Sequence, residues 1–97
     1  MLFSIRCIDR ADAPGLRAAT RPAHIDYLTS LGGRIVAAGP LLAADEATPI
    51  GSLLIVEGPD RAGAVELAAQ DPYAEAGLFA ETVIQPFRLV FLNPPAA

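Results

Sequence analysis

The apolar runs RIVAAGPLL (residues 34–42) and SLLIVE (residues 52–57) flank the polar loop ADEATP (residues 44–49) in the middle of the chain. Each run has the length and composition of a strand, and sequential strands with a short connection usually pair antiparallel. Residues 35–38 and 53–56 are apolar on both faces, which predicts inner strands of a sheet that is covered on both sides. The fold is therefore built around this pair of strands.

The chain before this pair predicts a strand followed by a helix. Residues 2–9 alternate apolar and polar side chains, which is the period of a strand. Residues 14–31 carry apolar side chains three and four positions apart, as on one buried helix face, before Gly32-Gly33 ends the pattern. Pro22 lies inside this span and has no backbone N–H, so the helix either begins near residue 21 or is kinked there, and we favour the later start for its regular part.

The chain after the pair predicts a second helix and a last strand. Residues 62–70 supply the helix, and the connection that follows has room for one helical turn over residues 73–76. The last strand is predicted over residues 81–91, where Pro86 indicates an edge position or a bulge. Residues 93–97 are expected to form a flexible tail.

The order strand, helix, strand, strand, helix, strand predicts an α+β fold of the ferredoxin-like, βαββαβ type. Two helices would cover one face of an antiparallel four-stranded sheet, and residues 1–97 would form a single domain. The chain is 53% hydrophobic and 19% charged. A bare sheet of this composition would expose a larger apolar patch than a monomer usually shows. We therefore expect a homodimer that packs sheet to sheet, as in a dimeric α+β barrel.

Charge and cysteine content exclude several classes of partner and site. The net charge is −4 and the seven cationic residues are arginines scattered along the chain, so neither nucleic acid nor an anionic membrane is an expected partner. One cysteine and one histidine cannot form an internal disulfide or a closed zinc site, and no metal is expected. The N-terminus lacks a basic leader and no apolar run is long enough to span a bilayer. We expect a cytoplasmic protein.

His24 is the only histidine, and it lies among the apolar residues of the first predicted helix. A histidine side chain titrates near neutral pH, so with a polar partner in a pocket it can act as an acid/base catalyst. Asp71 is the candidate partner: its carboxylate can accept the N–H of one ring nitrogen and leave the other free for a substrate proton. The alternative is a core histidine satisfied by a backbone carbonyl or by Asp71, with Asp71 capping the turn ahead of it.

Four further residues are candidates for substrate binding. Arg21 lies one helical turn before His24 and can bind a carboxylate or phenolate, although an arginine at a helix start is often only solvated. Gly39 and Pro40 allow a close backbone approach at a strand end, which would line a pocket or only form a bulge. Tyr73 can donate a hydrogen bond or stack on an aromatic ligand, or it can simply cover a helix end.

Five spaced motifs occur in this order: RPAHIDYL (residues 21–28), GPL (39–41), Gly51, DPY (71–73) and GL (77–78). Together they resemble the YCII family of small α+β proteins, and the resemblance covers nearly the whole chain. It implies a ferredoxin-like dimer whose site is a histidine on the first helix and an aspartate after the second, here His24 and Asp71. It also implies an activity like that of cofactor-free enzymes that eliminate chloride from chlorinated hydroxyquinols.

The leading hypothesis is a small cofactor-independent enzyme of the lyase or isomerase type, acting by proton transfer on a small oxygenated molecule such as an aromatic one. His24 would be the acid/base and Asp71 would orient it. One alternative is a non-catalytic dimeric protein that binds a metabolite in the same pocket, for regulation; another is a structural domain with no pocket. An enzyme requires both side chains within hydrogen-bond reach in a cleft open to water.

Overall fold

The computed structural model describes residues 1–95. A single 3₁₀ turn, Gly32–Arg34, follows the first helix. The other elements, in chain order, are β1 (Leu2–Asp9), α1 (Leu16–Leu31), β2 (Ile35–Leu42), β3 (Pro49–Glu57), α2 (Arg61–Ala69), α3 (Pro72–Glu75) and β4 (Phe79–Phe87).

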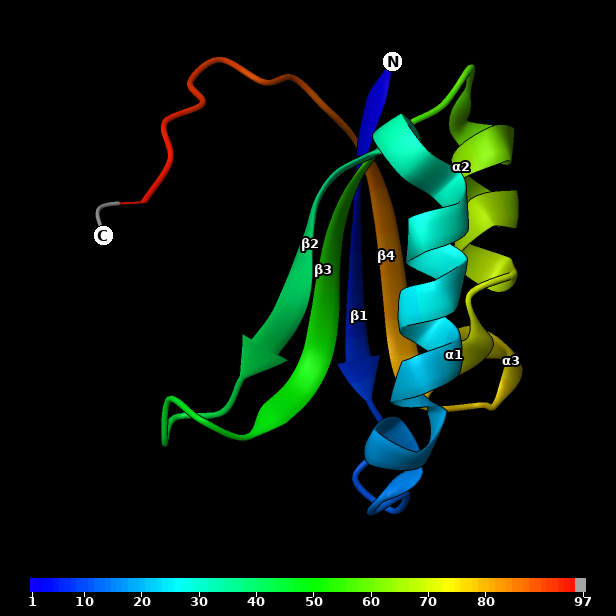
Figure 1. Cartoon of the computed structure of the whole chain (residues 1–97), viewed down its shortest axis with the longest axis vertical. Coiled ribbons are helices and arrows are strands. Elements are labelled where there is room, and N and C mark those ends of the chain that lie inside the picture. Colours follow the sequence, from blue (N-terminus) through cyan, green and yellow to red (C-terminus); the bar gives the residue numbers. More distant parts are fainter. Residues whose placement is uncertain (96–97) are drawn as a thin grey trace.

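The four strands form one antiparallel sheet in the order β2-β3-β1-β4, and the helices lie on one face of it (Figure 1). This confirms the predicted α+β, βαββαβ fold. The prediction that residues 35–38 form an inner strand was wrong, because β2 lies at the sheet edge. The connection through α1 leaves a gap of one strand between β1 and β2, and β3 occupies that gap.

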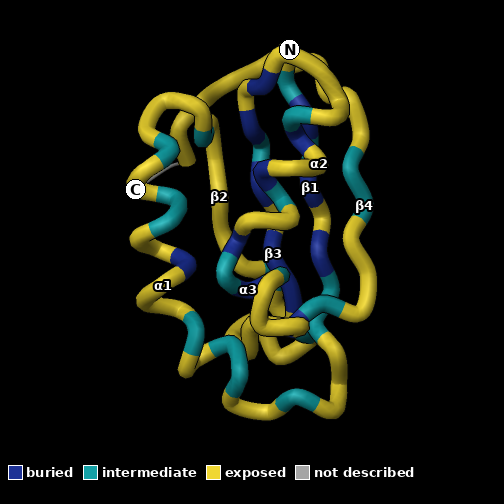
Figure 2. The backbone as a smooth tube through the Cα atoms, turned by 90° about the vertical axis from the view of Figure 1, so that its right-hand side faces the viewer, coloured by how far each residue is buried: buried dark blue, intermediate teal, exposed yellow. Residues whose placement is uncertain are grey.

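The core lies between the sheet and α2. Figure 2 shows the buried positions of β1 and β3 alternating with less buried ones, as the period of two predicts. Fully burying one large apolar side chain stabilises the fold by about 1.5–3 kcal/mol. The core residues are Phe3, Ile5 and Cys7 of β1, Leu54 and Val56 of β3, and Ala64 and Leu67 of α2.

Helix α1 begins at Leu16, so the predicted start near residue 21 was wrong. Gly15 precedes it with φ of 79°, a left-handed conformation that glycine adopts without strain. Pro22 lies inside the helix and removes only one hydrogen bond, the one that an N–H at position 22 would donate to the Ala18 carbonyl. Tyr27 ties the helix to α2 by donating its hydroxyl to the Leu67 carbonyl at 2.7 Å.

Strand β4 lies at the sheet edge, as Pro86 indicated, but its predicted bounds of 81–91 were wrong at both ends. Pairing begins at Phe79, opposite Asp9, and ends at Phe87, opposite Leu2. Leu2 is the first residue of β1, so β4 ends where its partner strand begins. Residues 88–95 leave the sheet without regular structure (Figure 1), while residues 96 and 97 of the predicted tail lie outside the described residues.

Gly51 lies where the backbones of β3 and β1 are too close together to admit a side chain. A Cβ atom at this position would overlap the backbone carbonyl oxygen of Cys7. We expect Gly51→Ala to lower the free energy of unfolding by about 1–3 kcal/mol, because the two central strands must separate to admit the methyl group. Gly33→Ala is the matched control, since nothing lies within 4 Å of a Cβ there. Equal urea midpoints for the two variants would contradict this account.

Among residues 1–95, no helix has the length and apolar character needed to cross a membrane.

Candidate functional site

A buried hydrogen bond joins His24 in the middle of α1 to Asp71 at the start of α3. Nδ1 of His24 lies 2.8 Å from Oδ1 of Asp71, across 47 positions of sequence. The two residues are 8% and 3% exposed. The pair that the sequence suggested is therefore in direct contact, and it is held inside the protein.

Asp71 is fixed by the helix that it caps. Its Oδ1 also accepts the backbone N–H of Tyr73 at 2.9 Å, and Pro72 occupies the first turn, where a missing N–H costs nothing. A carboxylate only accepts hydrogen bonds, so the ring proton of neutral His24 is on Nδ1 and the lone pair is on Nε2. The cap thereby sets the tautomer of the histidine.

The free nitrogen of His24 is open to solvent. Among residues 1–95, Nε2 has no hydrogen-bond partner, and no fully buried side-chain nitrogen or oxygen in that range lacks one. His24 also lines a cavity. Nε2 is thus the atom of the pair that an incoming molecule can reach.

Tyr73 lies between His24 and a cation. Its ring stacks on the His24 imidazole with centroids 4.0 Å apart and 20° between the planes, and Arg17 Cζ lies 4.5 Å from the centroid of the tyrosine ring. Tyr73 is 1% exposed. Burial raises the pKa of its phenol, although the charges of Arg17 and Arg21 oppose this rise. Tyr73 is therefore a neutral hydrogen-bond donor at physiological pH.

Arg17 is clamped in place by β1 and β3. Its Nε and Nη2 donate to the two carboxylate oxygens of Asp9 at 2.7 and 2.9 Å, and Nη2 also donates to Ser52 Oγ at 2.9 Å. Partial burial acts to lower the pKa of the guanidinium, but the hydrogen bonds and charge of Asp9 outweigh it and the pKa is raised. Arg17 thus supplies a fixed positive charge beside Tyr73.

The cavity has a volume of about 440 Å³ and lies between α1 and the strands β2 and β3. Its wall includes five of the six residues that the sequence singled out: Arg21, His24, Gly39, Pro40 and Tyr73. Asp71 is the exception, since it lies behind His24. The charged side chains among the described lining residues are Arg17 and Arg21, and no Asp or Glu is among them. Arg17 is paired with Asp9, so Arg21 is the cation that gives this wall its excess of positive charge.

Sequence reasoning missed Arg17 and Ser52. Arg17, Arg21 and His24 are four and three positions apart, the spacing of one helix face, so stepping back from His24 would have found Arg17. The late predicted start of the helix left Arg17 outside it. Ser52 alternates with the buried Leu54 and Val56 of β3, a period that places it on the same face of the sheet.

Comparison with known proteins gives curated relatives that align with most of this chain. Protein YciI of Escherichia coli O6:H1 is 37% identical over 98 residues, which cover 94% of this chain and 100% of that protein. An uncharacterized protein of Haemophilus influenzae is 38% identical over 82 residues, covering 77% of this chain and 84% of its own length.

Two solved structures share the fold. The 5-chloro-2-hydroxyhydroquinone dehydrochlorinase of Burkholderia phenoliruptrix AC1100, in complex with 2,5-dihydroxybenzoquinone, matches with a TM-score of 0.84 and 34% identity, over 91% of this chain and 94% of that one. An antibiotic biosynthesis monooxygenase matches with a TM-score of 0.56 over 93% and 99% of the two chains, but at 14% identity this is a likeness of fold alone. Residues 1–88 match the YCII-related domain, and with that match this chain belongs to the YCII-related domain family.

Proposed function

We propose that this protein is a cofactor-independent enzyme of the lyase type that removes a proton and a halide from a small, oxygenated, anionic ring compound. The observation that carries the proposal is the His24–Asp71 hydrogen bond, which leaves Nε2 of His24 open at the wall of the cavity. The likeness to a dehydrochlorinase at 34% identity supports chlorinated hydroxyquinols as the substrate class.

The proton transfer follows from the tautomer of His24. Nε2 takes a proton from a hydroxyl group of the substrate, and the electron pair released at that oxygen forms a carbonyl bond. As this bond forms, the ring carbon that bears chlorine takes up a proton and becomes tetrahedral. Loss of the proton of a second hydroxyl group, conjugated with that carbon, then forms a second carbonyl and a ring double bond and expels chloride, so the organic product has lost HCl and no oxidant is needed. Asp71 holds the imidazole in orientation and stabilises the imidazolium, which then returns its proton to water.

The remaining residues of the cavity bind the ring. Arg17 and Arg21 stabilise the phenolate that forms during proton removal, and Tyr73 donates to an oxygen of the substrate. Gly39 and Pro40 bring the backbone of β2 to the opposite wall without a bulky side chain. A flat molecule then fits between α1 and β2.

The test of this proposal is chloride release from a panel of chlorinated hydroxyquinols, followed by ion chromatography. Hydroxyquinol without chlorine and an aromatic lactone serve as controls for halide loss. We expect turnover of the chlorinated compounds alone. If the compounds bind, as measured by calorimetry, and none is turned over, the protein is a binding protein and the enzymatic proposal is wrong.

Arg17 should affect substrate affinity in this assay. Arg17→Gln removes the fixed positive charge from the cavity wall, and we expect kcat/KM to fall about tenfold, the loss of one charge-assisted hydrogen bond. Arg17→Lys keeps the charge without the two-point contact to Asp9, so it should lie between wild type and Arg17→Gln. Arg10→Gln is the control, because Arg10 pairs with the exposed Asp12. An unchanged kcat/KM in Arg17→Gln would remove Arg17 from the proposed site.

We also propose that the protein is a homodimer formed through the sheet face that carries no helix. Leu53 is exposed on that face, and Ile55 and Val83 are half-buried there. Covering these side chains with a second copy would remove apolar surface from water, which favours association. The oligomeric state of the full chain, measured by sedimentation, tests this proposal.

A further inference from the structure

The chain carries a second exposed apolar feature, the segment that follows β4. Residues 88–92, here named the arm, have the sequence RLVFL. Val90, Phe91 and Leu92 are 73%, 84% and 74% exposed. Scattered exposed apolar residues are common, but consecutive ones at this exposure usually mark an interaction site.

The arm has the composition of a strand, but it has no strand to pair with in its own chain. Its residues continue the pattern that predicted a strand up to residue 91. Pairing stops at Phe87 because its partner, Leu2, is the first residue of β1. An unpaired segment of high strand propensity that extends from a sheet edge is available to another chain.

The arm extends to the side of the sheet that carries no helix (Figure 1). The exposed Leu53 and the half-buried Ile55 and Val83 lie on that same side, so one partner placed there would cover both features. A second copy is such a partner, because in a two-fold arrangement each copy presents an arm and receives the other.

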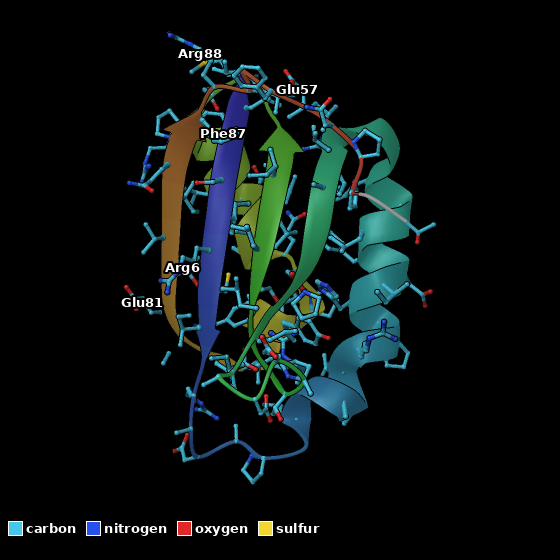
Figure 3. All side chains as sticks on the ribbon, turned by 90° about the vertical axis from the view of Figure 1, so that its left-hand side faces the viewer. Arg6, Glu57, Glu81, Phe87 and Arg88 are labelled. Atoms are coloured by element: carbon cyan, nitrogen blue, oxygen red, sulfur yellow. The ribbon has the colours of Figure 1, made fainter. Side chains whose placement is uncertain are left out.

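Charge on this face also fits a second copy. Figure 3 shows Arg6 and Glu81 in one region of the face, with Phe87, Arg88 and Glu57 at another. The pairs Arg6–Val83 and Ile8–Glu81 in the register place Arg6 and Glu81 on neighbouring strands. Glu57 is also paired with the N-terminal ammonium at 2.8 Å. The face therefore carries charges of both signs, and two copies can meet with unlike charges opposed.

We propose that the arm of each protomer packs on the helix-free sheet face of a second copy and clamps the dimer. This inference rests on the homodimer proposed above and adds a specific segment to it. The match to the YCII-related domain ends at residue 88, so residues 89–92 lie beyond it.

The first experiment compares dimer dissociation constants by analytical ultracentrifugation. In the triple variant Val90→Ser, Phe91→Ser, Leu92→Ser we expect the constant to rise about tenfold or more, because three apolar side chains no longer leave water on association. Val65→Ser, which removes an exposed apolar side chain from α2, is the control and should leave the constant unchanged. A triple variant that dimerises like the full chain overturns the proposal.

A sheet-face variant separates the arm from the dimer itself. Ile55→Glu places a charge in the middle of the helix-free face and is expected to weaken the dimer. If Ile55→Glu dissociates the dimer and the triple variant does not, the dimer through the sheet face is supported and the proposed role of the arm is wrong. If the full chain is monomeric at millimolar concentration, both are wrong, and chloride release still tests the activity separately.

A second experiment locates the arm. A nitroxide on Phe91→Cys, mixed with ¹⁵N-labelled chain that carries no nitroxide, should broaden the amides of Arg6 and Leu53 across the interface. Cys7 does not compete for the label, because it is buried in the core. Amides of α2, on the other side of the sheet, should keep their intensity. Broadening confined to α2, or absent from a mixture that has formed mixed dimers, would overturn the proposed position.

Discussion

Replacing His24 with asparagine is expected to lower kcat for chloride release by about 10³-fold, within the range that removal of a general acid/base produces. Asparagine can accept a hydrogen bond, but it cannot take up a proton at physiological pH. Substrate binding should change little, because the arginines and Tyr73 remain in the cavity wall. The expected signature is therefore a fall in kcat at nearly constant KM, measured by steady-state kinetics.

Asp26→Asn is the matched control for this variant. Asp26 lies two residues farther along α1 and is exposed, so its side chain is remote from the cavity wall. Circular dichroism of each variant shows whether the fold is retained. Should folded His24→Asn release chloride at the wild-type rate, proton transfer by His24 is wrong, whatever the substrate.

The second large effect is expected for Asp71→Asn, with a loss of about 10²-fold in kcat. The amide keeps the Tyr73 N–H bond only with its oxygen in the place of Oδ1, the atom that also contacts His24 Nδ1. In that orientation it cannot supply the negative charge that stabilises an imidazolium, and in the opposite orientation its NH₂ group donates to Nδ1 and shifts the ring proton to Nε2. In that tautomer, the nitrogen facing the substrate has no lone pair to accept a proton.

The readout specific to this role is the ¹⁵N spectrum of the imidazole ring, which distinguishes the two tautomers. Asp60→Asn is a close control, because Asp60 caps α2 as Asp71 caps α3, accepting the Gly63 N–H at 2.8 Å. Asp60→Asn should leave both the ring spectrum and kcat unchanged. If Asp71→Asn also leaves both unchanged, Asp71 is a helix cap and nothing more.

Removing the Asp71 side chain has a cost in stability as well. Asp71→Ala would leave both the His24 Nδ1–H and the Tyr73 N–H without their acceptor in a buried region. Leaving a buried donor without an acceptor costs about 1–3 kcal/mol for each group. Activity assays of the alanine variant would therefore mix unfolding with chemistry, which makes asparagine the informative substitution.

Local patterns predicted the elements of this fold well. The alternation in β1 and the three-and-four spacing in α1 each follow from contacts with one buried face, so they are visible in the sequence. The errors arose where a distant segment decides the outcome. β2 lies at the edge because β3 inserts beside β1, and β4 ends at Phe87, opposite Leu2, where its partner strand β1 begins.

For the candidate site, the sequence by itself determined that His24 lies on the apolar face of a helix and that Asp71 begins a turn. Both properties depend on residues nearby in the sequence. Only the tertiary structure decided that the two side chains meet at 2.8 Å, and that Asp9 and Ser52 hold Arg17 beside Tyr73. The physical reason is that the backbone hydrogen bonds of a helix and its caps join residues a few positions apart. The contacts of the site instead depend on how the helices pack on the sheet. That packing is set by the burial of side chains from the whole chain at once.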